Sequence, residues 1–265
     1  MNNYRIIDAH AHIFPAKIAD KAVTSIGKFY GIEMDHAGVS DALIKSGRAI
    51  NIEKYLVCST ATKPEQVVPI NDFIFDECQK HQEFIGFATL HPDMENLDEE
   101  VERILQRGFK GIKLHPDFQQ FNIDDQKAFE IYKRVQGKLA ILFHTGDDRL
   151  EFSKPKRLAR VSDKFPDLRC IAAHFGGYKC WDEAYEVYDS KNIFMDTSSS
   201  LFSMSREQAL KFIDKFGVEQ FFFGSDFPMW RHEVELKRIE SLELDKVSLE
   251  KILYGNFDAA ILHYK

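Results

Sequence analysis

The chain has few cysteines, and they are scattered along the sequence. Its 265 residues include 4 cysteines, and none of these have the C-x-x-C spacing of a zinc ribbon or a redox motif. A chain of this size does not need cross-links for stability. We therefore expect reduced thiols and a cytoplasmic protein; the thiols are Cys58, Cys78, Cys170 and Cys180.

Long hydrophobic runs are also missing. No stretch of about 18 apolar residues occurs, so no membrane-spanning helix is expected. The opening residues, MNNYRIIDAHAHIF, lead directly into a strand-like run and lack the longer apolar core and small-residue cleavage site of a signal peptide. The sequence thus predicts no membrane partner.

The chain has no excess of positive charge either. With 35 Lys and Arg against 42 Asp and Glu, the formal net charge is −7, which on average repels nucleic acids and anionic membranes. Hydrophobic residues make up 44%, too many for a disordered chain. We expect a globular protein whose main partner is a small molecule.

What the sequence does contain is a repeated unit. Short apolar runs rich in β-branched and aromatic residues alternate with helical patterns, such as the one from Asp98 to Arg107. Eight such units occur. Their predicted strands are Arg5–Asp8, Tyr55–Cys58, Phe84–Ala88, Gly111–Leu114, Leu139–Phe143, Arg169–Ala173, Ile193–Asp196 and Phe221–Gly224.

Eight βα units favour a (β/α)8 TIM barrel, because buried parallel strands read as near-continuous apolar runs. A doubly wound open sheet is the alternative. No segment is rich enough in Pro, Gly or Ser to mark a domain boundary, so we expect a single domain over residues 1–265. The connection over residues 15–50 is long, and it is expected to form a helix and a lobe or lid near the barrel mouth.

Several metal-ligand residue types follow these strands. His10 and His12 end the first strand, and alternation places both on one face. Alone, this pair fits equally well with two hydrogen-bonded histidines. However, His144, His174 and Asp226 follow the fifth, sixth and eighth strands, and a closed barrel collects all such residues at its carboxyl rim. A set of three histidines and one aspartate suits Zn²⁺ first, with Fe²⁺, Mn²⁺ or Co²⁺ as alternatives.

The motifs around these residues resemble a known family. They are Asp8–Pro15, Gly111–Pro116, His144–Gly146, Ala173–Gly177 and Gly224–Pro228. Together they are similar to the amidohydrolase superfamily, in the amidohydrolase 2 branch related to aminocarboxymuconate semialdehyde decarboxylase. The motifs span almost the whole chain.

The resemblance implies roles for five residues. His10, His12, His144 and Asp226 would hold one divalent metal, and His174 would be the base or the group that orients water and substrate. Asp226 would share proton transfer with His174. The alternatives for His174 are a fifth ligand or a core histidine.

Lys113 is open to several interpretations. In binuclear relatives a carboxylated lysine at the end of the fourth strand bridges two metals. The resembling branch is usually mononuclear, so we expect a contact to a substrate carboxylate or a stem that carries its charge to solvent.

Other candidates could contact the substrate. His115 and His91 could line the pocket, although each His-Pro pair could merely end a strand. Asp117 then looks like a helix cap. Four residues in predicted loops are further candidates, with a solvated surface position as the alternative: Arg48, Arg149, Trp230 and Arg231.

Two reactions fit this site. The first is hydrolysis of a small organic, carboxylated substrate by metal-activated water. The alternative is metal-dependent non-oxidative decarboxylation. A barrel that binds a ligand or metal without turnover is more remote, and a nuclease would require a Glu where Lys113 stands. A homodimer is compatible with the sequence.

Overall fold

Eight parallel strands form one sheet in the computed structural model, which describes residues 4–189 and 192–263. Each strand pairs with the next one along the chain. The eight strands predicted from the sequence are confirmed. They are β1 (Ile6–His12), β2 (Ile52–Cys58), β3 (Phe84–Thr89), β4 (Gly111–Leu114), β5 (Ala140–Phe143), β6 (Cys170–Ala172), β7 (Ile193–Asp196) and β8 (Phe221–Phe222).

The sheet closes on itself between its first and last strands. The backbone N–H of Ala9 donates to the carbonyl of Phe223 at 2.8 Å, and that of Asp226 donates to His10 at 2.9 Å. The N–H of His12 donates to Phe227 at 2.7 Å. The predicted TIM barrel is therefore confirmed, and the open doubly wound sheet is excluded.

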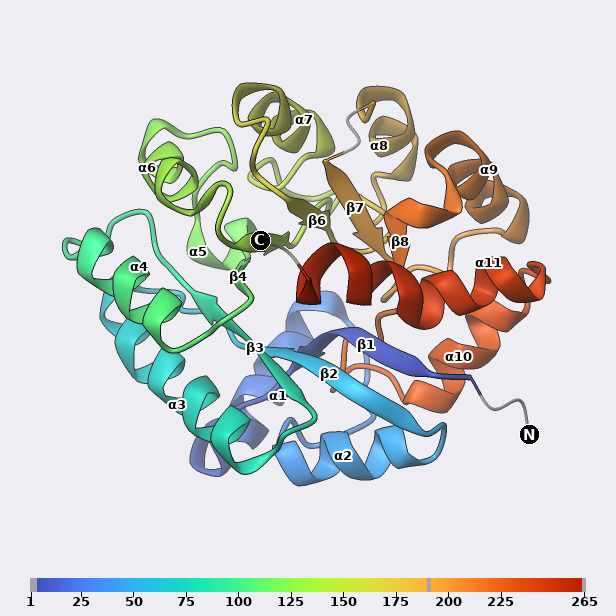
Figure 1. Cartoon of the computed structure of the whole chain (residues 1–265), viewed down its shortest axis with the longest axis horizontal. Coiled ribbons are helices and arrows are strands. Elements are labelled where there is room, and N and C mark those ends of the chain that lie inside the picture. The colour runs from blue at the N-terminus through green and yellow to red at the C-terminus, as the bar shows by residue number, and fades with distance from the viewer. Residues whose placement is uncertain (1–3, 190–191, 264–265) are drawn as a thin grey trace.

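Helices surround the barrel (Figure 1). The α-helices are α1 (Ala16–Tyr30), α2 (Ser40–Arg48), α3 (Val67–Lys80), α4 (Leu97–Gln106), α5 (Pro116–Gln119), α6 (Gln126–Val135), α7 (Pro155–Lys164), α8 (Trp181–Val187), α9 (Arg206–Phe216), α10 (His232–Glu240) and α11 (Lys246–Glu250). Short 3-10 turns are η1 (Pro64–Gln66) and η2 (Val218–Gln220), and π-helical turns are η3 (Lys251–Gly255) and η4 (Asp258–Leu262). In the described residues no helix is long and apolar enough to cross a membrane.

Alternate residues of each strand face the barrel interior or the helices. Leu142 and Phe222 belong to a small inner cluster, whereas Ile141 and Phe221 pack with the helices in the large outer cluster. Such alternation is what parallel strands buried on both faces require.

β1 departs from strict alternation. Asp8 pairs with Tyr55 but Ala11 pairs with Val57, so three steps of β1 oppose two of β2. This bulge inserts one residue into the strand and turns the following side chains to the other face. Ala9 packs in the inner cluster, and the neighbouring His10 ring also contacts inner groups. The bulge therefore aims the first histidine into the barrel.

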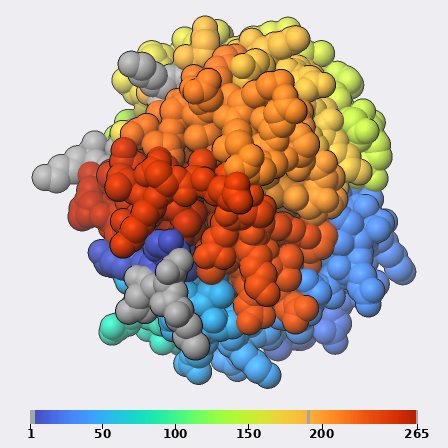
Figure 2. All heavy atoms as spheres, turned by 90° about the vertical axis from the view of Figure 1, so that its right-hand side faces the viewer, coloured from blue at the N-terminus to red at the C-terminus, as the bar shows by residue number. Residues whose placement is uncertain are grey.

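The C-terminal segment covers the end of the barrel opposite the mouth (Figure 1). The N–H of Phe223 donates to the carbonyl of Ile252 at 2.9 Å, and Phe257 packs edge-on against Phe222. Figure 2 shows this segment in red beside the dark blue start of β1, where Arg5 contacts Tyr254 at 2.5 Å. The barrel floor is therefore filled, and a ligand has to enter from the carboxyl ends of the strands.

The long connection after β1 contains α1 and α2. α1 runs beside the barrel mouth, where several of its side chains line a cavity. The lobe or lid expected for residues 15–50 stays a prediction.

Candidate active site

The carboxyl ends of the strands bring histidine and aspartate side chains together. His10 and His12 end β1, His144 follows β5, His174 follows β6, and Asp226 follows β8. All of these except the partly exposed His12 are buried. The barrel rim thus collects the residues that the sequence singled out.

His10, His12 and Asp226 form a group that can hold a metal ion, since their ligand atoms lie within 4.8 Å of one another. The Nε2 atoms of the two histidines are 3.1 Å apart. Oδ1 of Asp226 lies 3.7 Å from Nε2 of His10 and 3.5 Å from Nε2 of His12. Two imidazole nitrogens and one carboxylate oxygen are a donor set that Zn²⁺ and Mn²⁺ both accept.

The opposite side of the His10 ring is held by a carboxylate. Nδ1 of His10 lies 2.9 Å from Oδ2 of Asp196 and 3.1 Å from Oγ of Ser198. A carboxylate can only accept a hydrogen bond, so the proton of the His10 ring stays on Nδ1. The lone pair of Nε2 then faces His12 and Asp226, and we call His10, His12 and Asp226 the ligand group. Asp196 was not among the predicted site residues. Its position at the end of β7 was the available signal.

His174 and His144 form a second pair behind this group. Nδ1 of His174 lies 3.2 Å from the carbonyl of Ser198, so this nitrogen carries the proton. Nε2 of His174 then accepts from Nδ1 of His144 at 3.1 Å. To bind a metal through Nδ1, His144 would have to carry its proton on Nε2 instead. The role of His144 as a fourth ligand stays a prediction.

The backbone at two of these residues adopts the left-handed conformation. φ is 63° at His174 and 57° at Asp226. Non-glycine residues held in this region cost about 1–3 kcal/mol each, and they cluster at functional sites. The N–H of His174 donates to Asp196 at 3.1 Å, which helps to fix this turn.

Burial controls the charge of the site. It lowers the pKa of His10 and His12 well below 6.5, and nearby Lys113 adds to the effect. Burial also lowers the pKa of His174 to about 4 and raises that of Asp226 to about 7. The imidazoles are therefore neutral near pH 7, as ligands and a proton acceptor need to be.

Lys113 lies beneath the ligand group. Its side chain is fully buried, and Nζ lies 3.1 Å from Nε2 of His10. Burial lowers the pKa of this ammonium. Its charge does not reach solvent, so the alternative of an apolar stem with a solvated head is wrong. The carboxylated bridge and the substrate contact stay predictions.

A third set of polar groups forms one wall of the site. The Tyr30 hydroxyl lies 3.2 Å from Nε2 of His115 and 3.4 Å from Nε2 of His144. Oδ2 of Asp117 accepts from Ser153 at 2.5 Å, while its buried Oδ1 has no hydrogen-bond partner among the described residues. Burial raises the pKa of Asp117 to about 6.

This wall favours hydrogen bonding over metal binding. The ligand atoms of His115, Asp117 and His144 lie within 4.8 Å of one another, but the two imidazole rings stack at 4.0 Å with only 6° between their planes. An imidazole lone pair lies in the plane of its ring, so two rings stacked in separate parallel planes cannot both point a lone pair at one ion about 2.1 Å away. Asp117 was expected to be a helix cap, but it is His115 that accepts from the α5 backbone, at Phe118.

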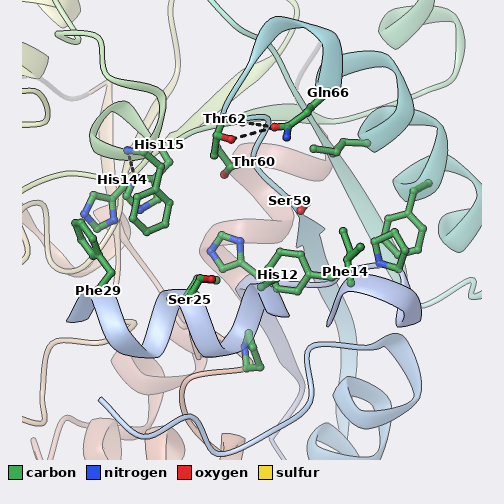
Figure 3. Close-up of a pocket in the computed structure, with 18 of the residues that line it drawn as sticks. His12, Phe14, Ser25, Phe29, Ser59, Thr60, Thr62, Gln66, His115 and His144 are labelled. Carbon is green, nitrogen blue, oxygen red and sulfur yellow. Dashed lines mark hydrogen bonds between the residues drawn. The ribbon is translucent and has the colours of Figure 1, made fainter. Parts of the chain in front are cut away.

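A cavity of about 1080 Å³ opens above these groups (Figure 3). Five predicted residues line it, namely His12, His115, His144, His174 and Asp226. Figure 3 shows His12 near the middle of the lining residues and His115 and His144 at one end.

The other predicted substrate contacts do not line the cavity. Trp230 donates its indole N–H to Ser199 at 2.9 Å, and Ser199 in turn donates to Asp226 at 2.6 Å. His91 accepts from the backbone of Asp93 at 3.2 Å, as expected for a strand end. Arg48, Arg149 and Arg231 are also outside the lining.

Arg149 has a structural role beside the cavity. It pairs with Asp147 at 2.6 Å and donates to the carbonyl of Phe29 at 2.8 Å. This anchors the end of α1, which carries Tyr30. The sequence could not predict Tyr30 as a site residue, because the packing of α1 over the mouth is a long-range contact.

Comparison with solved structures shows the same fold in three decarboxylases. 5-Carboxyvanillate decarboxylase from Sphingomonas paucimobilis superposes with a TM-score of 0.76 at 13% identity, covering 98% of this chain and 99% of that chain. The enzyme of this name from Novosphingobium aromaticivorans, complexed with manganese and 4-hydroxy-3-methoxy-5-nitrobenzoic acid, gives 0.75 at 18% identity, covering 97% and 96%. 2,6-Dihydroxybenzoate decarboxylase from Rhizobium gives 0.72 at 17% identity, covering 97% and 98%.

Comparison of the sequence identifies a family but no individual relative. No curated protein matches the chain. The model of the amidohydrolase family matches residues 7–256, which begin within β1 and include β8 and every motif between them. The chain therefore belongs to the amidohydrolase family, in the amidohydrolase 2 branch that its motifs resemble, and is an enzyme of that family.

Proposed function

We propose that the protein is a metal-dependent non-oxidative decarboxylase of small aromatic or unsaturated carboxylic acids. The observation that carries the proposal is the convergence of His10, His12 and Asp226 at the base of a large cavity. The decarboxylases that share the fold favour this reaction over hydrolysis, which was the first expectation from the sequence. Hydrolysis by activated water becomes the second candidate.

When bound, a divalent cation would supply positive charge that favours binding of a carboxylate substrate. His10, His12 and Asp226 would hold it, with His144 as the predicted fourth ligand. Manganese in a neighbour's complex favours Mn²⁺ over the Zn²⁺ expected from the ligand types. Asp196 keeps His10 in the tautomer that this role needs.

The chemical step breaks the bond between a substrate carbon and its carboxylate. That carbon takes up one proton, and CO₂ leaves with no net oxidation or reduction. His174 and Asp226 both face the cavity and are the proton carriers that the proposal assigns. Ser199, itself held by Trp230, orients the Asp226 carboxyl.

The reaction is tested by incubating manganese-loaded protein with 2,6-dihydroxybenzoate, 5-carboxyvanillate, lactones and amides. We expect CO₂ release from a carboxylate, and in D₂O one deuterium at the carbon that lost it. Protein treated with EDTA is the control and should release none. Turnover of a lactone or amide without CO₂ would instead support the hydrolase.

Metal binding has its own measurable consequence. A cation that binds only the folded chain stabilises it by about 2.7 kcal/mol at 100 times its Kd. For a chain of this size, this raises Tm by roughly 5–10 °C. Thermal unfolding with EDTA, Mn²⁺ or Zn²⁺, together with metal analysis, should show this shift and about one ion per chain. Two ions with a modified Lys113 would contradict the mononuclear centre.

A further inference from the structure

The cavity extends well beyond the ligand group. Its volume of about 1080 Å³ lies just above the roughly 300–1,000 Å³ of pockets that hold drug-sized ligands. An acid with a single ring, bound at His12 and Asp226, would leave most of this space unfilled. The extension therefore needs an occupant other than the reacting carboxylate.

Two helix faces form the walls of the extension. Ile18, Ala22, Ile26 and Phe29 recur on α1 at helical spacing and line one side. In Figure 3, α1 runs along the lower side of the view, with Ser25 and Phe29 on it and Thr62 and Gln66 across from it. We call this extension the α1–α3 groove.

The α3 side of the groove is also apolar. Pro69, Ile70 and Phe73 line it, again at helical spacing. Ile70, Phe73 and Ile26 are only partly buried, and Ile18 is 44% exposed. These apolar surfaces have no protein covering them within the described chain, so an apolar ligand there removes them from water.

The charges of the groove disfavour a second anionic group. Of the described residues that line the cavity, Lys17 is the one cation, and it lies on the exposed side of α1. Glu65 and Asp76 line the same region. Asp72 lines it too, but it is paired with Arg103 and Arg107, which lie outside the lining.

We propose that the α1–α3 groove binds an uncharged, apolar extension of the substrate, so that the enzyme acts on monocarboxylates with a sizeable apolar part. This rests on the proposed function, because it assumes that the single carboxylate is held at the ligand group. For the second carboxylate of a dicarboxylate of equal size, the groove offers Lys17 alone against Glu65 and Asp76, so dicarboxylates bind more weakly.

The test is a binding series on the manganese-loaded protein by isothermal titration calorimetry. Benzoate, 4-ethylbenzoate, 4-butylbenzoate and 4-hexylbenzoate are compared with terephthalate. We expect the affinity to rise about threefold per methylene, somewhat less than full burial of each group would give. Terephthalate should bind no more tightly than benzoate.

Two variants locate the effect. Ala22→Trp fills the middle of the groove, so it should leave benzoate affinity unchanged and remove the gain with chain length. Lys21→Trp, which adds the same side chain at a neighbouring exposed position of α1 outside the lining, is the matched control and should keep the gain. Should Ala22→Trp fail to fold, Ile70→Ser provides a second measurement, with a smaller gain per methylene.

The outcomes separate the two proposals. If EDTA leaves the affinity for benzoate unchanged, the proposed function fails, while the dependence on chain length still tests the groove. A flat series, or no binding at any chain length with and without manganese, overturns the groove proposal. So does a dimer, seen by ultracentrifugation and dissociated by Ile18→Asp, because a second copy would then cover the groove.

Discussion

Replacing His174 with Asn is expected to leave the cation bound and to lower kcat by about 10²–10⁴-fold, the usual contribution of a proton-transferring side chain. His174 lies outside the ligand group of His10, His12 and Asp226. It forms a second candidate group with His10 and Asp196, but Nδ1 of His10 already bonds to Asp196 there. Asn also tolerates the left-handed backbone that His174 adopts, so the fold should survive. Steady-state kinetics and metal analysis of the same preparation check both parts.

A matched control is available for this variant. His91 is also buried and also follows a strand, but it lies outside the cavity lining. His91→Asn should therefore change kcat little. Loss of metal in His174→Asn would make His174 a ligand, and unchanged kcat would remove it from proton transfer.

The second large effect is expected at Asp8, which ties β1 to the segment after β8. Its Oδ1 accepts from the N–H of His10 at 3.1 Å and from the N–H of Ser225 at 2.9 Å. Its Oδ2 accepts from Ser225 Oγ at 2.6 Å and lies 3.0 Å from Nε2 of His232. Asp8→Ala leaves these buried donors without a partner.

We expect Asp8→Ala to lower the free energy of unfolding by about 3–5 kcal/mol, since a buried donor without a partner costs about 1–3 kcal/mol. Affinity for Mn²⁺ should fall as well, because His10 and Asp226 lie beside the broken contacts. Urea unfolding and a manganese titration measure these effects. Asp20→Ala, at an exposed position of α1, should stay within about 0.5 kcal/mol of the native chain. An equally small loss of stability in Asp8→Ala would show that the Asp8 contacts between β1 and the segment after β8 do not stabilise the barrel as proposed.

The strands and the rim residues could be predicted because both depend on local pattern and on one topological rule. Apolar runs such as Ala140–Phe143 mark the strands, and the residue after each run must lie at the carboxyl rim of a closed barrel. Asp196 satisfied the same rule at the end of β7. It was missed because a lone aspartate ending a strand carries no motif of its own.

Other features of the site depend on contacts that no local pattern reveals. The bulge between Asp8 and Ala11 is a property of the pairing with β2, so alternation alone could not show how His10 enters the barrel. Tyr30 reaches the site because α1 packs across the mouth. Trp230 was predicted to touch substrate, but its indole N–H is bound to Ser199. Only the fold shows which loop side chains point inward.

The closure of the barrel between β1 and β8 also has a consequence for how the enzyme matures during synthesis. His10 and His12 leave the ribosome first, whereas Asp226 follows only after seven further strands have been made. A partly translated chain therefore has the two imidazoles without the carboxylate, and its hold on a cation should be weak. Tight manganese uptake would then report that the last βα unit has emerged and docked.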